Sequence, residues 1–225
     1  MSSPIANNSK STIQKIAVSI HQQGAHKKRV QQLIDALVTA ISKLDQPKNC
    51  IDVGCGDMSL AEGIAQRMPE TNWTCLDVYP IPLEKQNEDR WQKYIFFNGS
   101  VLPLPSKSKD VVLFSDVLHH ATAKDQVELI KEALRVAKYV VIKDHFEHGF
   151  WSRSVLQLMD IYGNWGYGVS IPKKYFSKQS FNVLAGKLNC NVRYEREELG
   201  LYCHIPLLKY VLRPNWHFIA VLTAT

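Results

Sequence analysis

Short apolar runs alternate with segments of helical spacing along most of the chain, and this alternation predicts an α/β fold. Several runs have the length and composition of strands buried on both faces of a sheet. The predicted strands cover 49–53, 72–77, 94–97, 111–114 and 139–145, and the predicted helices between them cover 59–68 and 124–137. This succession of βα units predicts a doubly wound, mostly parallel sheet with helices on both faces.

Two helices are predicted ahead of the first strand, over 9–23 and 25–44, with Gly24 between them. Apolar residues at helical spacing in the second helix indicate that it buries one face. The basic residues Lys27, Lys28 and Arg29 are expected to form a solvated first turn. We therefore divide the chain into an N-terminal helical extension, 1–46, and a domain over 47–225.

The alternation of predicted strands and helices stops at residues 147–190, a segment rich in aromatic residues and glycines. Helices are predicted over 152–161 and 179–188, and two strands near 191–197 and 216–223 close the chain. An aromatic-rich insertion suits a lid that shapes an apolar pocket. The alternative is a small helical subdomain whose aromatic side chains fill their own core.

Composition and charge indicate which partners, cysteine chemistry and cell compartment to expect. The net charge of +6 is of a size that enzymes carry without binding nucleic acid, so no nucleic-acid partner is expected. The five cysteines are scattered and include no C-x-x-C pair, which favours reduced thiols over disulfides or a zinc site. No apolar run approaches the length of a membrane span, and residues 1–10 lack a secretory signal, so a cytoplasmic location is expected.

The most informative stretch is the exit of the first predicted strand, where Asp52 precedes Gly54 and Gly56. A strand, a glycine turn and a helix let backbone N–H groups and bare Cα positions approach a nucleotide closely. Asp77 ends the next strand about 20 residues further on, where a carboxylate can accept ribose hydroxyls. Ser59 stands where the dinucleotide fingerprint has its last glycine, which argues against a nicotinamide oxidoreductase.

Together with Asp52, the turn resembles motif I of class I S-adenosylmethionine (SAM) methyltransferases, with Met58 in place of the third glycine. The stretch 115–120, Ser-Asp-Val-Leu-His-His, resembles the signature that follows the fourth strand of ubiquinone- and menaquinone-type methyltransferases, the type 11 methyltransferase domain. The resemblance covers residues 26–145 and the closing strands. It implies a Rossmann-like seven-stranded sheet with an antiparallel last strand, and the helical segment 147–190 is then an insertion between strands five and six. It also implies that SAM is the methyl donor and S-adenosylhomocysteine the product.

The resemblance implies a role for each residue that matches a motif. Asp52 would hold the methionine ammonium of SAM, Asp77 the ribose, and Ser100, in place of the family's aspartate, would lie near adenine. N-terminal helices often cover the cofactor in such enzymes, so a lid role for 25–44 is the alternative to a solvated turn. The implied cofactor-binding residues are Asp52, Gly54, Cys55, Gly56, Asp77, Val78, Ser100, Val101 and Asp116.

Methyl transfer from SAM requires above all that the acceptor be held in line with the methyl group, and a base only where the acceptor loses a proton. Because imidazole titrates near neutrality, the candidate bases are His145, which we prefer, then His119 and His120. The candidate acceptor-binding residues in the insertion are Asn164, Tyr167 and Tyr175. Asp144, His145 and His148 do not by themselves specify a metal site, and no metal is expected.

We therefore expect a SAM-dependent methyltransferase that acts on a small organic acceptor, apolar or aromatic, with O- and C-methylation both open. An RNA or protein methyltransferase is one alternative, encouraged by the sequence pI of about 9.0. A non-catalytic SAM-binding protein is another, because Met58 and Ser100 depart from the family pattern. The expected oligomeric state is monomer or homodimer.

Overall fold

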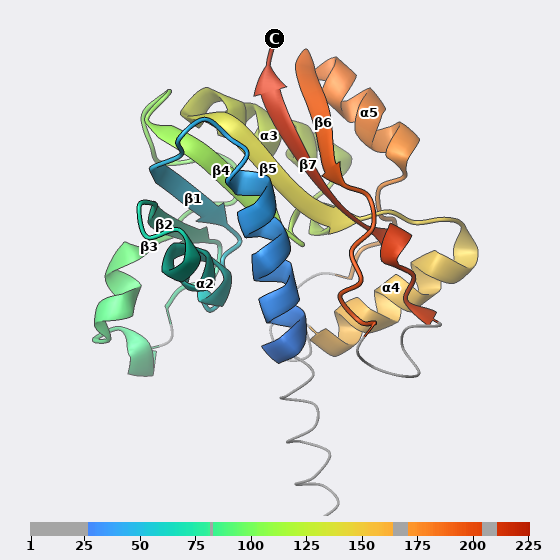
Figure 1. Cartoon of the computed structure of the whole chain (residues 1–225), viewed down its shortest axis with the longest axis horizontal. Helices are drawn as coiled ribbons and strands as arrows, with labels where there is room; N and C mark the ends of the chain where they lie inside the picture. The colour runs from blue at the N-terminus through green and yellow to red at the C-terminus, as the bar shows by residue number, and fades with distance from the viewer. Residues whose placement is uncertain (1–26, 82, 164–170, 204–210) are drawn as a thin grey trace, which may run out of the picture.

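A computed structural model of the chain describes residues 27–81, 83–163, 171–203 and 211–225. Its centre is a seven-stranded sheet in the order β3-β2-β1-β4-β5-β7-β6 (Figure 1). The strands are β1 Asn49–Val53, β2 Asn72–Asp77, β3 Tyr94–Phe96, β4 Lys109–Ser115, β5 Ala137–His145, β6 Cys190–Arg196 and β7 His217–Ala224. β7 is antiparallel to both of its neighbours, whereas the pairs from β3 to β5 are parallel. The predicted Rossmann-like fold is confirmed, including the inserted last strand.

Helices cover both faces of this sheet (Figure 1). The N-terminal helix, 27–41, and α2, Ser59–Arg67, pack on one face, and α3, Ala123–Val136, and α5, Lys178–Lys187, pack on the other. Alternate residues of one strand enter the two cores, as Cys50 and Ile51 of β1 do. Because both faces are buried, the central strands are continuous apolar runs, which made them recognisable in the sequence.

Helix α4, Phe150–Gly163, lies below the carboxyl ends of the strands in the view of Figure 1 and has a small core of its own. Val155 and Leu156 of this helix pack with Tyr175, Leu212 and Trp216. Four other described aromatic residues of the insertion divide between core and surface. Phe176 and Phe181 join the core under the sheet, whereas Phe150 and Trp151 are exposed.

Local signals explain where the helices begin. The Thr122 hydroxyl accepts the Asp125 N–H at the start of α3, and Ser177 and Ser180 form a reciprocal capping box at the start of α5. α2 instead begins after a left-handed residue, Met58, as the glycine turn requires. None of the described helices is long and apolar enough to cross a membrane.

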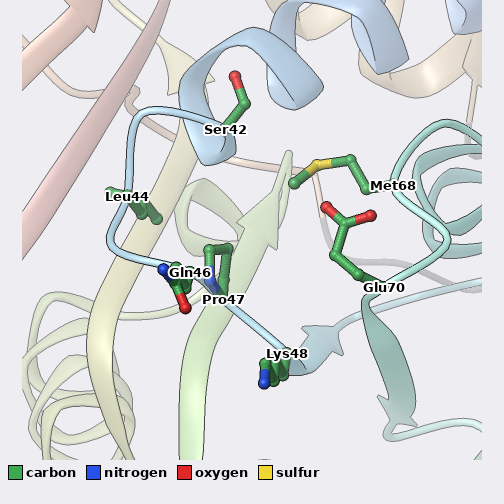
Figure 2. Close-up of a pocket in the computed structure, with 7 residues that line it drawn as sticks. All are labelled: Ser42, Leu44, Gln46, Pro47, Lys48, Met68 and Glu70. Atoms are coloured by element: carbon green, nitrogen blue, oxygen red, sulfur yellow. The ribbon is translucent and has the colours of Figure 1, made fainter.

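Figure 2 shows a pocket beside the amino-terminal end of β1. It is lined by Ser42, Leu44, Gln46, Pro47, Lys48, Met68 and Glu70. In a parallel sheet, ligands bind at the carboxyl ends of the strands. This pocket lies at the opposite ends, away from the edge of the sheet where a functional site is expected.

Candidate functional site

The turn after β1 is held in place by the neighbouring strand. The N–H groups of Gly54 and Cys55 donate to the Leu76 carbonyl of β2, at 2.7 and 3.2 Å. Gly54 has a φ of 75°, and a Cβ at this position would lie 2.5 Å from Cγ2 of Val117. Gly56 has a φ of 53° but faces open space. Packing therefore requires glycine at 54, whereas Gly56 leaves room above the turn for a ligand.

Asp77, at the end of β2, fastens this turn through its side chain. One carboxylate oxygen accepts the Gly56 N–H at 2.8 Å, and the other accepts the N–H groups of Val78 and Tyr79 at 2.7 and 3.3 Å. Asp77 is only 6% exposed. The residue predicted to bind ribose thus also orders the loop that would receive the nucleoside.

Asp52 fits the predicted role of holding an ammonium group. Its side chain is buried, and Oδ2 has no hydrogen-bond partner among the described residues. Burial, with smaller contributions from the charges of Asp77 and Asp57, raises its pKa to about 7. An unpaired buried carboxyl oxygen is costly unless a partner arrives. The methionine ammonium of SAM is a partner of the right charge, so the residues around the turn fit the cofactor.

This pKa predicts that cofactor affinity depends on pH. Below about pH 7 the Asp52 carboxyl is protonated in the free protein and cannot pair fully with an ammonium group, so the affinity for S-adenosylhomocysteine should rise between pH 6 and 8. Calorimetric titration across this range measures the effect. The Asp52→Asn variant should bind more weakly and show no such rise. Asp57→Asn removes a neighbouring charge and should move the rise to lower pH. An identical pH profile in all three proteins would contradict the role of Asp52.

Met58 occupies the position of the family's third glycine and keeps a glycine-like backbone. Its φ is 64°, in the left-handed region, and its side chain is 1% exposed within the core. Left-handed backbone costs a non-glycine residue about 1–2 kcal/mol. Burial of the long side chain offsets a cost of that size. The departure from the motif therefore leaves the geometry of the turn intact.

The predicted adenine-side residues are already engaged with one neighbour. The side-chain oxygen of Asn98 accepts the Ser100 N–H and hydroxyl, both at 3.0 Å, and the Val101 N–H at 3.1 Å. Val101 is exposed. Asn98 thus shapes the loop after β3, and the predicted contacts of Ser100 and Val101 with adenine remain predictions.

A second group of polar side chains lies at the ends of β4 and β5. Nδ1 of His119 is 2.6 Å from Oδ1 of Asp144, and both side chains are fully buried. Because Asp144 accepts the proton on Nδ1, the lone pair of a neutral His119 is on Nε2. That atom has no hydrogen-bond partner among the described residues and lies 3.5 Å from Oδ2 of Asp160 in α4. This pairing is the arrangement by which a carboxylate orients a histidine base.

The electrostatic environment shifts the pKa values of two candidate bases, His119 and His145, in opposite directions. Burial alone would lower the pKa of His119, but the carboxylates of Asp144, Asp160 and Asp116 outweigh it and raise that pKa. Burial and the charge of Lys143 lower the pKa of His145. Both histidines are buried, but only His119 combines an orienting carboxylate with a raised pKa. The geometry therefore favours His119 over His145, the residue preferred from the sequence.

Of the predicted acceptor-binding residues, the structure brings one to this group. Tyr175 places its ring centroid 5.3 Å from that of His119, and its hydroxyl donates to Asp160. His120 also lies beside His119, with ring centroids 4.2 Å apart. Asn164 and Tyr167 fall within 164–170, outside the described residues. Tyr175, His119 and Asp160 thus form one wall of a candidate acceptor site.

Asp116, one of the predicted cofactor-binding residues, is the centre of an ion cluster. It pairs with Lys143, with Arg29 at 3.4 Å and with Nδ1 of His145 at 3.3 Å. Burial opposes its ionisation, but Lys143, His145 and Arg29 together lower its pKa to about 2. Its φ of 57° is left-handed, a strain found mostly at functional sites.

Several residues of the site were missed or misjudged from the sequence. Arg29 was expected in a solvated turn, but its side chain is only 24% exposed and reaches Asp116, whereas Lys27 and Lys28 are exposed as expected. Lys143 is fully buried inside β5. A lysine within a strand run was the one signal that could have revealed it.

Two sets of donor atoms among the described residues are spaced closely enough for a metal ion. They are Asp116, His119, Asp144 and His145, and His119, His120 and Asp160. In the first set, Lys143 and Arg29 already neutralise Asp116, so a further cation would be repelled. In the second, Asp160 already accepts the Tyr175 hydroxyl. We assign no metal to either set, and the expectation of a metal-free site stays a prediction.

Comparison with known proteins connects these features to a family. The family described as "Methyltransferase domain" matches residues 51–139, from β1 into β5. No curated protein matches the sequence. Many solved structures share the fold, at low sequence identity.

Three of these structures illustrate the similarity. One, at a TM-score of 0.63 and 15% identity, is a complex between the Haloferax volcanii Trm112 methyltransferase activator and a methyltransferase; the match covers 92% of this chain and 94% of that one. Magnesium protoporphyrin IX methyltransferase from Synechocystis, with bound SAH, matches at a TM-score of 0.57 and 16% identity, over 90% of this chain and 87% of its own. The mitomycin 7-O-methyltransferase MmcR matches at a TM-score of 0.58 and 17% identity, over 88% of this chain. The chain spans about half of that enzyme, 53%.

The strand order, the glycine turn and the family match define a class I methyltransferase domain. Residues 51–139 match the methyltransferase-domain family, and the sheet has the fold of SAM-dependent methyltransferases of class I. The recognition made from the motifs is thereby confirmed. The acceptor is the part of the function that the family does not specify.

Proposed function

We propose that this enzyme transfers the methyl group of SAM to a hydroxyl oxygen of a small organic acceptor. The observation that carries the proposal is the pair formed by His119 and Asp144, with Nε2 of His119 left without a hydrogen-bond partner among the described residues. A neutral hydroxyl must lose its proton when it is methylated, and a histidine held in this way can take that proton.

In this proposal each residue has a distinct task. SAM, when bound, supplies a methyl group activated by the positive sulfonium. Asp144 holds His119 so that Nε2 faces the acceptor side, where Asp160 and Tyr175 lie. Nε2 takes the hydroxyl proton as the oxygen bonds to the methyl carbon and the carbon–sulfur bond breaks, which leaves S-adenosylhomocysteine. Asp144 then stabilises the imidazolium.

The surroundings of His119 favour an acceptor with an aromatic or apolar body. The rings of Tyr175 and His145 lie 5.3 Å from that of His119, and α4 contributes apolar side chains beside Tyr175. Aromatic and apolar walls with a few placed polar groups are typical of small-molecule sites. Arg29 and Lys143, the two basic residues beside this group, pair with Asp116 and so are not available to bind phosphates.

The test is a screen of paired acceptors. Phenols, hydroxyquinones and aliphatic alcohols are each incubated with the enzyme and SAM beside their own methyl ethers, and S-adenosylhomocysteine release is measured. We expect turnover with at least one hydroxyl compound and none with its ether, and an O-methyl product by NMR. A C-methyl product would refute oxygen transfer. SAM binding without turnover on any acceptor, while added RNA is methylated in a salt-dependent manner, would favour the RNA methyltransferase instead.

A further inference from the structure

Arg29 is placed unusually for a residue in the first turn of a helix. Its side chain leaves the N-terminal helix and reaches the carboxyl ends of the strands, where one amino group lies 3.4 Å from Oδ2 of Asp116. The guanidinium also stands 5.5 Å above the ring of Tyr202. Its Nε is buried and has no hydrogen-bond partner among the described residues. A guanidinium offers five N–H donors, so the contacts described leave part of its capacity unused.

This guanidinium lies close to the glycine turn. Its partner Asp116 directly precedes Val117, the residue that a Cβ at Gly54 would strike. β4, which ends just before Asp116, pairs with β1, which ends just before Gly54. Arg29 therefore stands on the same side of the sheet edge as the turn and the unpaired oxygen of Asp52.

The methionine end of SAM carries two charges, an ammonium and a carboxylate. Asp52 offers an unpaired oxygen for the ammonium, and the carboxylate needs a cation near the same turn. Lys143 is fully buried and pairs with Asp116, whereas Arg29 makes a longer contact with Asp116 and its Nε has no partner among the described residues. A guanidinium is also the side chain that best matches the two oxygens of a carboxylate.

We propose that Arg29 binds the carboxylate of the methionine end of SAM, so that the N-terminal helix is a working part of the cofactor site. Asp52 would then bind the ammonium group and Arg29 the carboxylate of the same amino-acid end. This inference rests on SAM binding by the family and is independent of the proposed hydroxyl acceptor.

The test compares ligands that differ only at this end. The full chain is titrated calorimetrically with S-adenosylhomocysteine and with 5′-methylthioadenosine, which keeps the nucleoside and the sulfur but lacks the amino-acid group. Arg29→Gln should weaken S-adenosylhomocysteine binding by roughly 10- to 100-fold, the range for a charge-assisted hydrogen bond, and leave methylthioadenosine binding within about twofold. The Arg29→Lys variant should bind S-adenosylhomocysteine with an affinity between those of the wild type and Arg29→Gln. Lys28 is an exposed neighbour on the same turn, and Lys28→Gln should change the affinity for neither ligand.

Two outcomes would overturn the proposal. Unchanged S-adenosylhomocysteine binding in Arg29→Gln would mean that Arg29 serves only Asp116, and an equal loss for both ligands would mean that it only supports the fold. A second measurement can be made even if the Arg29→Gln variant does not fold. Decarboxylated SAM should bind the wild type about 10-fold more weakly than SAM, and this preference should shrink in Arg29→Lys. A preference that is absent from the wild type would also refute the proposal.

Discussion

Replacing His119 by glutamine is expected to lower kcat by about 10²- to 10⁴-fold and to leave S-adenosylhomocysteine affinity nearly unchanged. Glutamine keeps a polar side chain of similar reach but cannot accept the proton that the hydroxyl loses. His119 lies beside Asp160 and Tyr175, and none of its described contacts is with the glycine turn proposed to bind the cofactor, so the loss should fall on the chemical step. Steady-state kinetics with the acceptor found in the screen, together with calorimetric titration, separates the two effects.

Asp144→Asn supplies the pH signature that a merely structural role would not produce. The base must be unprotonated, so kcat/KM should rise with pH through the pKa of His119, which the neighbouring carboxylates hold above its usual 6.5. Without the Asp144 charge, that pKa falls and the rise moves to lower pH, while the maximal rate drops because the ring is no longer oriented. A reduced rate with an unmoved pH profile would exclude the pair as the acid–base unit.

Replacing Lys143 by methionine is expected to lower the free energy of unfolding by about 3–5 kcal/mol. Lys143 is fully buried in β5, and its ammonium pairs with Asp116. Methionine fills a similar volume but leaves Asp116 with only Arg29 and His145 as partners. Urea denaturation measures the loss. The Lys143→Met, Asp116→Asn double variant removes both charges and should recover part of it.

Lys138 provides a matched control on the same strand. It lies in β5 as Lys143 does and pairs with Asp45 at 2.8 Å, but both side chains are exposed to solvent. An exposed pair contributes at most about 1 kcal/mol. Lys138→Met should therefore be nearly neutral. Equal losses in the two variants would show that burial does not set the strength of the Lys143 pair.

The sequence predicted the sheet and the glycine turn because both are encoded locally. Strands buried on both faces are continuous apolar runs, and Asp52, Gly54 and Gly56 lie within five residues of one another. The acceptor side is assembled from distant segments. His119 follows β4, Asp144 ends β5, Asp160 lies in α4, and Arg29 arrives from the N-terminal helix.

No local pattern indicates which of these side chains will meet, so the sequence favoured His145 as the base, whereas the contact with Asp144 favours His119. The same limit explains Arg29. Three basic residues in a row predict a solvated turn, and Lys27 and Lys28 follow that rule. Arg29 departs from it because Asp116, 87 positions further along the chain, provides a partner inside the protein.

The position of β7 has a consequence for how the protein is made. β7 is the last strand in the chain, yet it lies between β5 and β6, and its pairing covers an edge of each. Until residues 217–224 leave the ribosome, the apolar edge of β5 stays open to solvent and to other nascent chains. Chaperone protection during synthesis should therefore matter most between the emergence of β5 and that of β7, a window of some seventy residues of translation.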